Sequence, residues 1–123
     1  MKDLKDLFVP YEIGKKLKEI GFNQPCFSCY CQGEIRFIRV GYSWCENITD
    51  FEIYAPTYEQ VKLWFMEKHL IFITVNCEKW LSDFKGQVET SDAIIDTEMF
   101  HDYNEAFNAA IYAAIPFINK DNN

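Results

Sequence analysis

The sequence predicts an α+β fold, with a mainly antiparallel sheet of four to five strands and three helices packed on one side of it. Three observations support this prediction. Apolar residues recur at helical spacing in three segments, β-branched and aromatic residues gather in the segments between them, and tight-turn residues join several of those strands. The expected order is α-β-β-β-α-β-β-α.

The first helix is expected from about Pro10 to Ile20. Proline suits the first helical turn, because the N–H that it lacks has no partner there, and Gly21 supplies a stop. One apolar face follows helical spacing: Val9, Ile13, Leu17 and Ile20.

A β-hairpin should follow, because Gln32-Gly33 lies between two extended segments at 26–31 and 34–40. Aromatic and β-branched residues would then pair across the strands. The pairs are Phe27 with Ile38, and Tyr30 with Ile35. Residues 41–50 are typical of a loop, and Phe51 to Ala55 are expected to form a third strand.

A second helix should begin at Thr57 and run to about His69, since Thr57 and Gln60 form a capping box. Its inward face would hold Val61, Trp64 and Phe65. The segment from Leu70 to Asn76 is apolar on both alternate faces, which indicates a central strand.

The last third of the chain is expected to hold a hairpin and a helix. Residues 80–84 would turn at Lys85-Gly86 into residues 87–90, and residues 93–95 are too few to assign. Asp102 and Glu105 mark a helix start, and Pro116 should kink or fray the last turn. The buried stripe would be Phe107, Ala110, Ile111, Ala114 and Ile118.

Composition indicates one domain over residues 1–119, with a polar tail at 120–123. Hydrophobic residues make up 49% of the chain and aromatic residues 17%, so a core needs neither metal nor disulfide. Residues 1–10 show no secretory signal, and no apolar run approaches the roughly 18–20 residues of a membrane span. The chain has five cysteines, an odd number. These features favour a cytoplasmic protein with free thiols.

The net charge of −7 argues against nucleic-acid binding, which needs clustered lysines or arginines. Between Leu81 and Glu105 the sequence has seven carboxylate residues and a single lysine, Lys85. That imbalance is typical of a solvated face, and the rival interpretation is a surface that repels or imitates nucleic acid.

Three stretches of the chain resemble motifs of other small proteins. They are Leu7–Glu12 followed by Lys16–Phe22 and Gln24–Phe27; Ala55–Gln60 with Trp64-Phe65 and Glu67-Lys68; and Tyr103–Ala106. Through them the chain resembles an uncharacterised family of Bacteroides-like gut bacteria and their phages and mobile elements. The resemblance implies a bacterial or phage origin but no activity or cofactor, and the family does not generally have cysteine at positions 29 and 31.

Cys26, Cys29 and Cys31 form the most conspicuous cluster and are candidate zinc ligands, which Cys45, Cys77 or a histidine would complete. An extended strand sends Cys29 and Cys31 to one face and Cys26 to the other. Free cysteine also behaves as a small apolar group. Thiols of the core or surface are therefore the favoured interpretation, a redox pair is a weaker one, and no cofactor is expected.

Other polar candidates are weaker. A hard-metal site could draw on Asp92, Asp96, Glu98, His101 and Asp102, but their spacing matches no calcium loop. His69 and His101 are the only imidazoles available for general-base catalysis. A helix C-terminus favours a structural role for His69, and a Cys–His pair stays open.

Aromatic residues around the least regular segment are candidates for contact with a partner, although such residues more often form core. They are Tyr42, Trp44, Phe51, Tyr54 and Tyr58. The sequence therefore predicts a non-enzymatic phage or mobile-element accessory module that acts by protein–protein interaction, with a host or phage protein or a second copy as partner. The alternative is a small-molecule-binding or enzymatic domain with a pocket between sheet and helices, using Cys29 or His101.

Overall fold

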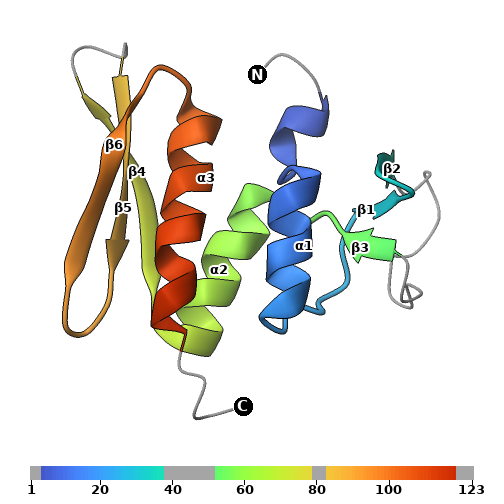
Figure 1. The fold of residues 1–123 in the computed structure, drawn as a ribbon, viewed down its shortest axis with the longest axis horizontal. Coiled ribbons are helices and arrows are strands. Elements are labelled where there is room, and N and C mark those ends of the chain that lie inside the picture. Colours follow the sequence, from blue (N-terminus) through green and yellow to red (C-terminus); the bar gives the residue numbers. More distant parts are fainter. Residues whose placement is uncertain (1–3, 38–51, 79–82, 119–123) are drawn as a thin grey trace. The chain divides into compact units, whose positions relative to one another are not determined.

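A computed structural model describes residues 4–37, 52–78 and 83–118 (Figure 1). These residues form three α-helices and two three-stranded antiparallel sheets, which confirms the α+β class. The expectation of one sheet with four to five strands is wrong, because six strands divide between two sheets. Residues 1–60 and 61–123 are two compact units, described in turn below, and the single-domain expectation stays a prediction.

Helix α1 (Tyr11–Glu19) confirms the first predicted helix and follows a short 3-10 turn, η1 (Leu4–Leu7). Pro10 caps it in an extended conformation, and Gly21 after it has a φ of 102°, a left-handed value that suits glycine. Ile13 and Leu17 are buried as expected, whereas Ile20 is only half-buried.

The first sheet has the order β2-β1-β3, formed by β1 (Ser28–Cys31), β2 (Glu34–Phe37) and β3 (Glu52–Tyr54). The predicted pairing of Tyr30 with Ile35 is confirmed. Gln32 and Gly33 both have positive φ, 54° and 82°, as a two-residue hairpin turn requires. Ile38, the expected partner of Phe27, lies outside the described residues.

Close packing joins α1 to this sheet. A methyl group added at Gly14 would lie 3.0 Å from both Ile53 Cγ2 and the carbonyl oxygen of Tyr54. The Tyr30 hydroxyl donates a 2.8 Å hydrogen bond to the carbonyl oxygen of Val9, and burial raises the pKa of that hydroxyl. The Tyr30 ring meets Tyr11 edge-on, with 5.4 Å between centroids.

Helix α2 (Tyr58–His69) begins with the predicted capping box. Thr57 Oγ1 accepts a hydrogen bond from the Gln60 N–H, and Gln60 Oε1 accepts one from the Thr57 N–H, both at 3.1 Å. Leu70 ends the helix at a φ of 54°, where its N–H donates to the Met66 carbonyl oxygen. A leucine thus occupies the left-handed position that glycine usually takes.

The second sheet has the order β4-β5-β6, formed by β4 (Phe72–Glu78), β5 (Asp83–Glu89) and β6 (Ile94–Phe100). Two expectations are wrong here. Among the described strands β4 lies at an edge and not at the centre, and β5 runs straight through Lys85-Gly86, where the sequence predicts a turn. β6 gives residues 94–100 a strand that the sequence alone does not assign. The actual turn follows Thr90, whose Oγ1 accepts the Asp92 and Ala93 N–H groups.

Helix α3 (Tyr103–Ala114) lies against all three strands of this sheet (Figure 1). Asp102 caps it by accepting the Asn104 N–H at 3.0 Å, which confirms the predicted helix start. Pro116 lies in a 3-10 turn, η2 (Ile115–Phe117), where the α-helix stops. The predicted stripe is buried as expected.

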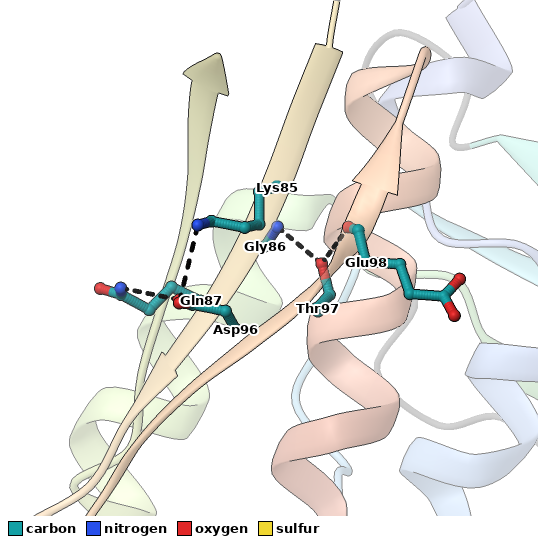
Figure 2. A network of polar contacts seen from close by, with 6 residues as sticks. All are labelled: Lys85, Gly86, Gln87, Asp96, Thr97 and Glu98. Carbon is teal, nitrogen blue, oxygen red and sulfur yellow. Dashed lines mark hydrogen bonds and ion pairs between the residues drawn. The ribbon is translucent and has the colours of Figure 1, made fainter.

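Gly86 lets α3 approach β5 closely. A methyl group added there would lie 2.6 Å from the carbonyl oxygen of Ala106 and 2.9 Å from Ala110 Cβ. Opposite Gly86, β6 carries two residues, Thr97 and Glu98, in a bulge. Thr97 Oγ1 accepts the Gly86 N–H and donates to the Glu98 carbonyl oxygen, both at 2.8 Å (Figure 2).

Gly86→Ala should therefore lower the free energy of unfolding by about 1–3 kcal/mol, because the added methyl group meets helix backbone that cannot move alone. Urea unfolding with an unchanged m-value would measure the loss. Thr74→Ala, at an exposed position of β4, is the control and should change stability little. Equal stability of Gly86→Ala and the unmodified protein would contradict this packing.

Candidate functional site

The predicted aromatic contact group is only partly described. Tyr42, Trp44 and Phe51 lie outside the described residues. Tyr54 is 8% exposed, and its ring meets Phe22 edge-on at 6.4 Å between centroids, so it belongs to the core of its unit. Tyr58, the first residue of α2, is half-buried. Tyr54 therefore offers little surface to a partner.

The first three cysteines lie in different surroundings, because Cys26 precedes β1 while Cys29 and Cys31 belong to it. Cys29 and Cys31 lie two residues apart on β1 and so share one face. Cys26 is buried and its thiol donates to the carbonyl oxygen of Gln24 at 3.1 Å, while the Cys29 thiol lies 3.6 Å from Glu52 Oε2. Across the described ranges, no three His, Cys, Asp or Glu side chains are placed to hold a metal ion.

The candidate hard-metal ligands between Asp92 and Asp102 also make separate contacts. Asp92 lies in the β5–β6 turn, Asp96 pairs with Lys85, and Asp102 caps α3. His101 Nδ1 lies 2.7 Å from Asp83 Oδ1, with the His101 side chain 92% exposed. These residues serve separate local contacts.

A different set of residues is brought together on the face of the β4-β5-β6 sheet opposite α3, named here the outer face. Its residues follow from the strand register, since directly paired residues share a face. They form three rows across the sheet: Phe72, Glu89 and Ile94; Thr74, Gln87 and Asp96; Asn76, Lys85 and Met99.

Large apolar side chains are exposed at the margins of the outer face. Phe72 is 46% exposed, Ile94 63% and Met99 41%. Phe72 and Ile94 flank the exposed carboxylate of Glu89 in one row. The outer face thus combines apolar surface with negative charge.

A polar network occupies the centre of the outer face (Figure 2). Lys85 Nζ lies 3.6 Å from Asp96 Oδ2, and Gln87 Nε2 donates to Asp96 Oδ1 at 3.0 Å. The hydrogen bond from Gln87, together with the charge and hydrogen bond of Lys85, outweighs desolvation and lowers the pKa of the Asp96 carboxyl. Asp96 therefore stays ionised. Its negative charge compensates the positive charge of Lys85, the single lysine between Leu81 and Glu105.

Reasoning from the sequence missed the outer face for a physical reason. The bulge at Thr97 and Glu98 shifts the alternation of β6 by one residue, so that Asp96 and Met99 share a face although three positions separate them. The signal that could have found β6 is the run of β-branched and apolar residues from Ile94 to Thr97.

Comparison with known proteins identifies no relative: no family model, no curated protein and no solved structure matches the chain. Within the described residues, no helix is both long and apolar enough to cross a membrane.

Gln87→Ala should raise the pKa of Asp96 toward its ordinary value, because the largest favourable contact of the carboxylate is lost. In the unmodified protein the lowered pKa stabilises the fold above the unfolded-state pKa of about 4, and that contribution is lost as pH falls through the folded-state pKa. Carboxyl ¹³C NMR titration measures the change. Ser91→Ala, in the exposed β5–β6 turn, is the control. An unchanged Asp96 midpoint in Gln87→Ala would refute the assignment.

His69 provides a second pH prediction. Burial, followed by the charge of Lys68, lowers its pKa despite the helix C-terminus, and its ring meets Trp64 edge-on at 4.8 Å. The unfolded state then binds the proton more readily than the folded state. The contribution of His69 to the free energy of unfolding is therefore complete above about pH 6.5 and is lost as pH falls through the folded-state pKa. NMR titration should give His69 a midpoint below 6.5, with His69→Gln assigning the signal. A midpoint at or above that value would contradict the packing.

Proposed function

We propose that this chain is a non-enzymatic protein-interaction module whose outer face binds a basic protein surface. The exposed apolar side chains of Phe72, Ile94 and Met99 among carboxylates carry this proposal. Burying such side chains supplies about 25 cal/mol per Å² of apolar area, which is the main favourable term in protein association.

Charge defines the chemistry of the partner. Lys85 is paired with Asp96, so its charge is already compensated, and the Glu89 carboxylate lies exposed between Phe72 and Ile94. The three rows of the outer face thus hold two carboxylates, Glu89 and Asp96, and one lysine. A partner with lysine or arginine around an apolar centre is complementary to this face and would be steered toward it.

The enzymatic alternative has less support in the described residues. The Cys29 thiol is buried and lies beside Glu52, and His101 is engaged with Asp83. The motif resemblance supports a phage or mobile-element setting and makes a host or phage protein the proposed partner.

A defined probe tests the proposal: a peptide of alternating lysine and leucine, titrated into ¹⁵N-labelled protein and compared with a glutamate–leucine peptide. Shifts should concentrate on β4, β5 and β6 and occur with the basic peptide alone. Phe72→Ser combined with Ile94→Ser should weaken binding at least tenfold, since each apolar contact is worth about 1–2 kcal/mol.

Tyr112→Ser is the matched control, because Tyr112 is similarly exposed but lies on α3. It should bind as the unmodified protein does. Equal binding by the Phe72/Ile94 variant, or shifts spread over the acidic residues of α1, would show that only general charge attraction operates.

A further inference from the structure

The two edges of the β4-β5-β6 sheet differ in how they are protected against pairing with another strand. Unpaired edges are templates for strand addition, and proteins block them with charges, prolines or bulges. β6 has two such devices, the bulge at Thr97 and Glu98 and the exposed carboxylates of Asp96 and Glu98. Strand addition at β6 is therefore disfavoured.

β4 has neither a bulge nor a proline, and its one charged residue, Glu78, is its last residue. Its seven residues pair with β5 without a register shift, and the segment from Phe72 to Cys77 contains neither a charge nor a proline. Thr74, Asn76 and Cys77 are exposed. Among the strands that the structure describes, β4 pairs with β5 alone, so its other edge is the candidate template for strand addition.

We propose that β4 pairs antiparallel with β4 of a second copy of the chain, around a two-fold axis at Val75. Val75 is the middle residue of the strand, so this register uses its full length. The two sheets would join into one of six strands, β6-β5-β4-β4-β5-β6. A two-fold contact of this kind closes on itself and stops at a dimer.

The sequence of β4 is complementary to itself in this register. Thr74 would face Asn76 of the second copy, and each of these side chains both donates and accepts hydrogen bonds. Ile73 would face Cys77, and Val75 would face Val75, which keeps apolar residues on the α3 side of the sheet. The same symmetric pairing at β6, centred on Thr97, would set Asp96 opposite Glu98 and repel.

Charge variants at exposed positions test the register. Thr74→Lys with Asn76→Lys sets lysines opposite lysines across the axis, and Thr74→Glu with Asn76→Glu does the same with carboxylates. Sedimentation equilibrium should give twice the 14.6 kDa chain mass for the unmodified protein at high concentration, and one chain mass for each variant alone. An equimolar mixture of the two variants should return to twice the chain mass, because lysines then face carboxylates.

Ser91→Lys, in the exposed β5–β6 turn, is the control and should dimerise as the unmodified protein does. Circular dichroism identifies any variant that fails to fold.

Oxidative cross-linking then gives an independent test. Val75→Cys in a Cys77→Ser background should form an intermolecular disulfide, because directly paired strand residues lie within the Cα separation that a disulfide allows.

A single-chain mass at millimolar concentration would overturn the proposal. So would a dimer that the lysine variant leaves intact, or cross-linking at Val75→Cys no faster than at Ser91→Cys in the same background. None of these readouts involves the basic peptide, so failure of the dimer and failure of the proposed docking face are distinguishable.

Discussion

The close approach of α3 to β5 at Gly86 fixes the organisation of the second unit. Only hydrogen fits between the β5 backbone and the Ala106 carbonyl oxygen, and Ala110 is small enough to lie beside it. Because α3 occupies this face, the alternate side chains of all three strands must lie on the other. Phe72 and Ile94 are exposed for that reason and not because the sheet lacks a core.

The bulge opposite Gly86 connects this packing to the surface. Thr97 supplies a hydroxyl acceptor for the Gly86 N–H, so the extra residue of β6 leaves no unpaired donor there. The shift in alternation brings Asp96 beside Lys85 and Gln87 on the outer face. The bulge at Thr97 and Glu98 thus places a carboxylate beside Lys85 on the outer face. The same bulge disfavours strand addition at the β6 edge.

The outer face and the β4 edge suit different contacts. The face presents exposed apolar side chains beside the carboxylate of Glu89, and the proposed basic partner would complement this combination. The edge presents neutral backbone between Phe72 and Cys77, which complements a strand like itself. An edge contact leaves the outer face open, so a β4-paired dimer would display two docking faces on one continuous sheet.

Local signals in the sequence determined the helices and the first hairpin. Pro10, the Thr57 capping box and Asp102 act within one turn of chain, so neighbouring residues suffice to predict them. Only the tertiary structure decided that Gly86 lies inside a strand, because its role is set by α3, twenty residues further along. The division into two sheets, the edge position of β4 and the outer face likewise arise from strand pairing between distant segments, which composition and periodicity do not encode.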